Sequence, residues 1–136
     1  MSIDLSIFIN YGPQLFLGFL MTIKIVISAI ILGIPFGLVL ALGQRSRLKL
    51  VRVLSASFIE IFRNTPFIIQ VFMFFYVLPF YGFHLPAAYV GIVALAAFGS
   101  AYFAEVIRGG INAVAKGQLE SARATGMSDW QAMRYV

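Results

Sequence analysis

Three polar side chains interrupt stretches of the chain that are otherwise apolar: Gln70, Ser100 and Glu105. Lipid penalises a charged or strongly polar group at membrane depth by about 2.5 kcal/mol or more, so such groups generally have a function or a structural partner. The chemistry open to an amide, a hydroxyl and a carboxylate in this setting is the binding of a polar solute. The alternative is a hydrogen bond or an ion pair within the fold.

The spacing of neighbouring residues indicates which structural partners are available. Glu105 precedes Arg108 by three residues, which predicts an ion pair on one helix face. Glu60 and Arg63 repeat this spacing, and the structural interpretation is stronger there. For Gln70, a hydrogen bond to another helix is slightly favoured over a place on a solute pathway.

Catalytic, metal and nucleotide chemistry find no support in the sequence. The chain contains no cysteine and one histidine, His84, which we expect to be a solvated loop residue. Thiol catalysis and zinc–thiolate sites are therefore excluded. A clustered set of His, Cys or carboxylate residues is also missing, as is a Gly-x-x-x-x-Gly-Lys-Ser/Thr loop. We expect no catalytic residue, no metal and no cofactor in this chain.

The composition is that of a membrane protein. Hydrophobic residues make up 61% of the chain and charged residues 11%, with a mean hydropathy of +0.94; soluble domains carry about 25% charged residues. The net charge of +5 does not indicate nucleic-acid binding, because the basic residues lie at the ends of apolar runs.

Uncharged runs predict an all-α, polytopic fold with three transmembrane helices at about residues 14–43, 57–79 and 87–115. Residues 25–44 are 20 residues without a charge, enough to cross a hydrocarbon core of about 30 Å. Between Arg63 and Glu105 lie 41 uncharged residues, about twice the length that one span needs. That run must therefore fold back on itself.

Prolines and glycines mark the expected breaks. Pro79 to Pro86 predicts a hairpin between spans two and three, and span two should kink at Pro66. Span three should end with Lys116 in its last turn and Gly117 as a left-handed C-cap.

Small residues predict close helix contacts within the apolar segments. Gly33, Gly37 and Ala41 form a small-xxx-small row in span one, typical of a packing seam within the chain or of a subunit interface. Gly99 and Ser100 thin span three, which provides either close packing or room for a substrate.

The Lys and Arg residues orient the chain. There are none in residues 1–14 or 79–87, five in residues 43–63 and four after Glu105. The positive-inside rule then predicts an outside N-terminus and a cytoplasmic segment 117–136.

This polar segment, residues 117–136, has the pattern of two helices joined at a glycine. Gln118 to Thr125 favour a helix, and Gly126 can adopt the left-handed conformation that ends it. Ser128 and Gln131 then match a capping box at the start of a second helix. The residues alone leave two roles open, docking to a soluble partner or lying on the lipid surface.

The same segment resembles the EAA loop of bacterial ABC-importer permeases. Glu120-Ser-Ala122, three residues, Gly126, nine residues and Val136 follow the pattern Glu-Ala-Ala, three, Gly, nine, Ile, one, Leu-Pro. Ser121 replaces the first Ala, and the closing Leu-Pro is missing. Two upstream segments, residues 62–79 and 101–110, resemble the polar-amino-acid branch of that family.

The resemblance implies a permease subunit of an ATP-driven importer of polar amino acids in the bacterial inner membrane. Its implied partners are a separate ATP-binding subunit that binds the ATP, a second permease as homo- or heterodimer, an extracytoplasmic solute-binding protein, the amino acid and the bilayer, with no nucleic acid. The residues implied in ATPase coupling are Gly117, Glu120, Ser121, Ala122 and Gly126.

Two further expectations concern the extent of the protein. Because family members continue with two more spans, residues 1–136 are expected to be a single permease domain cut short, an N-terminal fragment. The competing function is a non-transporting membrane anchor or assembly protein that recruits a cytoplasmic partner through residues 117–136.

Overall fold

The computed structural model describes residues 6–135, which contain six α-helices and no strand. The final residue of the predicted coupling motif, Val136, lies outside this range. The helices are α1 (Ser6–Gln44), α2 (Lys49–Asn64), α3 (Phe67–Phe80), α4 (Ala87–Ala113), α5 (Lys116–Ala124) and α6 (Asp129–Tyr135). The predicted all-α fold is confirmed.

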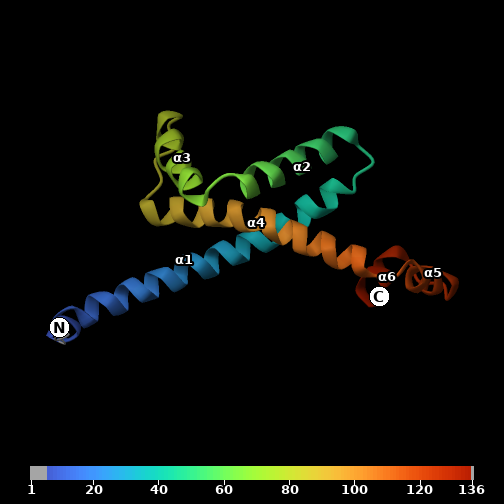
Figure 1. The fold of residues 1–136 in the computed structure, drawn as a ribbon, viewed down its shortest axis with the longest axis horizontal. Helices are drawn as coiled ribbons and strands as arrows, with labels where there is room; N and C mark the ends of the chain where they lie inside the picture. Colours follow the sequence, from blue (N-terminus) through green and yellow to red (C-terminus); the bar gives the residue numbers. More distant parts are fainter. Residues whose placement is uncertain (1–5, 136) are drawn as a thin grey trace.

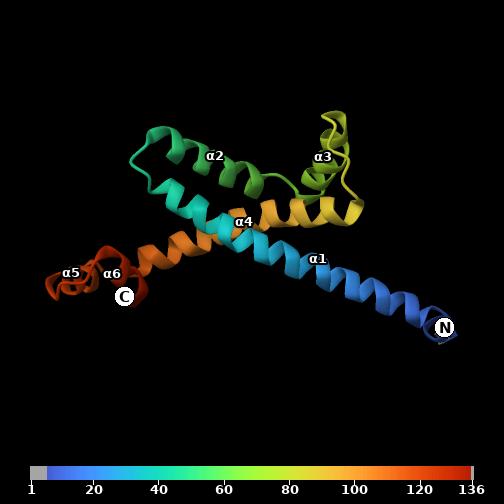
Figure 2. The ribbon, with the colours of Figure 1, turned by 180° about the vertical axis from the view of Figure 1, so that it is seen from behind.

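Two long helices, α1 and α4, form the frame of the molecule. They cross each other, and α2 and α3 lie on the same side of α4 while α5 and α6 continue beyond its far end (Figures 1 and 2). The N-terminal part of α1 extends away from the other helices. The large apolar side chains of α1 are mostly exposed, as expected of helices whose solvent is lipid.

Small residues allow the close approach of α1 and α4. A Cβ atom added at Gly33 would lie 3.2 Å from the carbonyl oxygen of Ala96, and one added at Gly37 would lie 2.8 Å from that of Ser100. The two glycines are four positions apart in α1, and Ala96 and Ser100 are four positions apart in α4. The two backbones therefore touch along one ridge of each helix. The predicted small-xxx-small row is therefore a packing seam within the chain.

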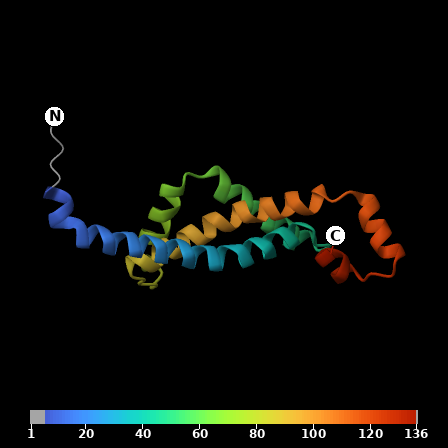
Figure 3. The same cartoon turned by 90° about the horizontal axis from the view of Figure 1, so that it is seen from below.

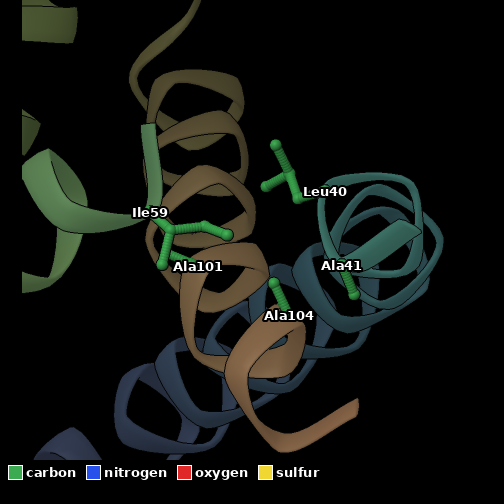
Figure 4. Packing of buried hydrophobic residues seen from close by; sticks show 5 residues of the cluster. All are labelled: Leu40, Ala41, Ile59, Ala101 and Ala104. Carbon is green, nitrogen blue, oxygen red and sulfur yellow. The ribbon is translucent and has the colours of Figure 1, made fainter. Parts of the chain in front are cut away.

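The buried core continues this seam toward α2. Leu40 and Ala41 from α1, Ile59 from α2, and Ala101 and Ala104 from α4 form one cluster (Figure 4). Three of these five residues are alanines, so the core depends on proximity of the backbones rather than on large side chains.

The second predicted span is not a single kinked helix. Its helical structure begins at Lys49, eight residues before the expected start at 57, and it is broken into α2 and α3, which meet at 110°. Thr65 ends α2 in an extended conformation, and Pro66 is the N-cap of α3. Proline lacks the N–H that would carry the helix across this point.

The end of α4 also differs from the prediction. The helix stops at Ala113, and Val114 and Ala115 are extended, with ψ angles of 122° and 135°. Lys116 starts α5, and Gly117 lies within that helix instead of capping the previous one. In the described chain, positive φ angles occur only at Gly82 and Gly126.

Within the described residues, two helices are long and apolar enough to cross a membrane: the Tyr11–Gln44 part of α1, and α4. The bent pair of α2 and α3 adds a third span if the two helices cross together. The predicted spans 14–43 and 87–115 match these two helices to within about three residues.

The α1–α4 seam predicts that Gly37→Ala destabilises the protein by about 1–3 kcal/mol, the usual range for overpacking. The added methyl group would meet backbone atoms of α4, which cannot rotate away. Thermal unfolding in detergent measures the effect. Gly18→Ala is the matched control, because no atom lies within 4 Å of a Cβ added there. Equal unfolding temperatures for the two variants would contradict the seam.

Candidate coupling segment and charged cluster

The segment formed by α5, Gly126 and α6 turns back on itself at the end of α4 (Figure 3). Gly126 has a φ of +84°, and its N–H donates to the carbonyl of Arg123 at 3.0 Å. The Met127 N–H donates to the carbonyl of Ala122 at 3.1 Å, so the chain leaves α5 through a left-handed residue. The predicted helix, glycine corner and second helix are present.

Side chains on both sides hold this corner. The Ser128 N–H donates to Oε1 of Gln131 at 2.8 Å, and the Gln131 N–H donates to Oγ of Ser128 at 3.3 Å, which is the predicted capping box. Arg123 donates to Oδ1 of Asp129 from Nη2 at 3.0 Å, which joins α5 to α6 across the corner. The ion pair is solvent-exposed, so its contribution to stability is small.

The residues implied in ATPase coupling lie on different faces of this segment. Glu120 and Ser121 are exposed, whereas Ala122 is only 5% exposed and packs inside the corner. Gly117 and Ser121 line an open hollow of about 500 Å³ together with Met127 and Tyr135. The segment therefore presents both a polar outer surface and a shallow depression.

The charged cluster at Glu105 is larger than the sequence indicates. Arg108 binds the carboxylate at both oxygens, with Nη2 to Oε2 at 2.6 Å and Nε to Oε1 at 3.1 Å, as predicted for the i,i+3 spacing. Arg63 from α2 approaches the same carboxylate, with Nη1 to Oε2 at 3.3 Å. Its guanidinium also lies 5.7 Å from the ring centroid of Tyr102.

One expectation for α2 is wrong. Among the described residues Glu60 forms no salt bridge, so the predicted pair of Glu60 and Arg63 is absent. Arg63 instead pairs across the helix interface, because α2 packs on α4 and the Glu105 carboxylate of α4 lies within its reach. No spacing rule links residues that are 42 positions apart.

A cavity of about 710 Å³ opens beside this cluster, between the ends of α1, α2 and α4. Six charged side chains line it, four arginines and two glutamates: Arg45, Arg52, Arg63, Arg108, Glu60 and Glu105. The surplus of positive charge favours an anionic group such as a carboxylate.

The two other predicted pathway residues lie elsewhere. Gln70 is 4% exposed, and its Nε2 donates to the carbonyl oxygens of Phe62 at 2.8 Å and Thr65 at 3.0 Å. Ser100 is fully buried, and its Oγ donates to the carbonyl of Ala97 at 2.7 Å. Neither residue lines the cavity at Glu105, and Ser100 lies where α1 and α4 pack closely. His84 is exposed in the loop after α3, as expected.

Comparison with known proteins identifies the family. The family described as the binding-protein-dependent transport system inner membrane component matches residues 33–136, which include the charged cluster and the whole glycine-corner segment. The chain belongs to this family. It is a multi-pass inner-membrane protein.

Its relatives include several amino-acid permeases. The chain is 40% identical over 124 residues to the glutamate/glutamine/aspartate/asparagine transport system permease protein BztC of Rhodobacter capsulatus, covering 88% of this chain and 28% of the relative. It is 35% identical to the arginine transport system permease protein ArtQ of Bacillus subtilis, covering 93% and 58%. The chain thus spans only 28% and 58% of the length of these two relatives.

A solved structure agrees with this family at the level of the fold. It is described as the crystal structure of an amino acid ABC transporter with histidines, is 40% identical in sequence and superposes with a TM-score of 0.88. The match covers 100% of this chain and 64% of that one. The broken helix and the crossing frame therefore occur within a fold that a related transporter shares.

The geometry of the cluster predicts a ranking of charge variants. Glu105→Gln leaves two arginines facing each other without a carboxylate, so it should lower the unfolding temperature in detergent more than Arg63→Gln, which leaves the Arg108 pair intact. Glu60→Gln is the control of matching chemistry and should have little effect. If Glu60→Gln destabilised the protein as much as Glu105→Gln, the cluster would not be the stabilising unit.

Proposed function

We propose that the chain is part of a permease subunit that imports polar amino acids, driven by ATP that a separate subunit binds and hydrolyses. The observation that carries this proposal is the helix–glycine–helix segment at the end of α4, within the part of the chain that matches the family. The names of the relatives support the substrate class, because they are permeases for glutamate, glutamine, aspartate, asparagine or arginine.

In this proposal residues 117–136 are the coupling segment of a single permease domain. Gly117, Glu120, Ser121, Ala122 and Gly126 form or support the surface that enters the ATP-binding subunit. Exposed Glu120 and Ser121 provide polar contacts, while buried Ala122 and left-handed Gly126 fix the corner. The chain itself contributes no catalytic residue and no cofactor.

The pathway residues have unequal support. Glu105 borders a cavity whose surplus of positive charge suits the carboxylate of an amino acid, and its own carboxylate holds Arg63 and Arg108 beside that cavity. Gln70 and Ser100 act through packing and hydrogen bonding around the pathway, because neither lines that cavity.

The assembly that follows has four further components. They are an ATP-binding subunit, a second permease identical or related to this one, an extracytoplasmic solute-binding protein and the amino acid, and no nucleic acid takes part. The basic residues after α1 and after Glu105 favour an outside N-terminus with residues 117–136 in the cytoplasm.

The coupling proposal predicts that Gly126→Ala weakens binding of the ATP-binding subunit. An alanine at a φ of +84° is strained by about 1–2 kcal/mol, which corresponds to a five- to thirtyfold loss if binding requires this corner. Glu120→Ala should also weaken binding by removing an exposed charge. Co-purification of the full-length permease with its ATP-binding subunit measures both effects, and amino-acid uptake should fall in parallel.

A matched control is available in α4. Gly109→Ala places the same methyl group in a regular helix with no atom within 4 Å of the new Cβ, so binding and uptake should be retained. Native binding of the ATP-binding subunit by both the Gly126→Ala and the Glu120→Ala variants would refute the assignment of the segment.

A further inference from the structure

The break between α2 and α3 removes a specific backbone hydrogen bond. In a continuous helix the carbonyl of Phe62 would accept from the N–H of residue 66, but residue 66 is proline and has none. The carbonyl oxygen of Thr65 also lacks its helical donor, the Ile69 N–H, because that group donates to the carbonyl oxygen of Pro66 at 3.0 Å instead. In a bilayer, water is not available to satisfy such groups.

The side chain of Gln70 supplies the missing donors. Its Nε2 reaches the Phe62 carbonyl at 2.8 Å and the Thr65 carbonyl at 3.0 Å, so one amide from the first turn of α3 caps the end of α2. Both acceptors are carbonyl oxygens, which fixes the orientation of the amide with the NH2 group toward α2. Oε1 is buried without a hydrogen-bond partner among the described residues, so the donors are the part of this side chain that the fold uses.

The capped turn carries Arg63. This residue lies between the two carbonyls that Gln70 binds, and its guanidinium contacts Glu105 at 3.3 Å and the ring of Tyr102. On the other side of the break, the ring of Phe67 packs on Phe98 of α4 with centroids 5.0 Å apart. The amide therefore joins two helix ends that are each separately attached to α4.

We propose that Gln70 is a positioning residue that sets the bend between α2 and α3 and thereby holds Arg63 against Glu105. It acts on the charged cluster through the backbone of residues 62–65 and has no direct contact with a solute. The 110° angle between α2 and α3 then depends on the side chain of Gln70, which replaces the backbone hydrogen bonds of a continuous helix.

Spin-label distances across the break test the proposal without any transport assay. Residues 1–136 contain no cysteine, so Leu54→Cys on α2 and Tyr76→Cys on α3, both more than 60% exposed, supply the two labelling sites, and any cysteine elsewhere in the transporter is first replaced by serine. The measurement uses the full-length permease in its assembled transporter in nanodiscs. Labelled permease is diluted with unlabelled permease so that only distances within one chain contribute.

We expect a single narrow distance for native Gln70 and a second population for Gln70→Met. Methionine matches the length of the side chain but has no hydrogen-bond donor for the two carbonyls. Thr22→Val is the control, because it also removes a side chain bond to a backbone carbonyl, from Thr22 to Gly18, but within one helix. Its distance should equal the native one.

A functional readout adds the link to Arg63, and this part rests on the proposed transport function. The Gln70→Met and Arg63→Gln variants should each lower uptake, and the double variant should be no worse than the more severe single variant, because both act through the same contact. A narrow native distance in Gln70→Met would overturn the proposal even if uptake by that variant were lowered. Absence of amino-acid uptake in the native protein would instead overturn the proposed function and leave the distance result standing.

Discussion

The close crossing of α1 and α4 is the constraint on which the rest of the structure depends. Gly33 and Gly37 let the two backbones approach until only a hydrogen atom fits between a glycine of one helix and a carbonyl of the other. Lipid provides little hydrophobic driving force between helices, so this contact must gain its energy from packing. Two further helices pack on this frame: α2 packs on both α1 and α4, and α3 packs on α4.

The charged cluster is a consequence of this frame. Glu105 lies one residue beyond the buried Ala104 of the α4 core, and Arg63 lies one turn beyond the buried Ile59 of α2. The packing of alanines and isoleucine therefore determines which charges can meet. The Glu105 carboxylate binds two arginines, yet its side chain remains 22% exposed. It can therefore stabilise the fold and also border the cavity.

The sequence predicts the features of this protein that depend on local rules. Uncharged runs located the long helices, and Ser128 with Gln131 located the start of α6, because helix capping involves residues only three positions apart. The break at Pro66 was underestimated as a kink, since its angle depends on a bond from the side chain of Gln70 to a carbonyl eight residues away. Gly117 was misplaced because nothing in Val114 and Ala115 marks them as extended.

The two extended residues between α4 and α5 determine how the glycine-corner segment is mechanically connected. Helices α5 and α6 pack chiefly on each other, so Val114 and Ala115 are the main covalent and structural connection to the frame. A force on Glu120 would thus be transmitted first through Val114 and Ala115 to α4, and then through the close contact at the glycines of α1 to that helix. The displacement that reaches α1 depends on the stiffness of both connections. A stiffer Val114–Ala115 linker, or a looser contact between α1 and α4, would therefore change the displacement of α1 without altering any binding surface.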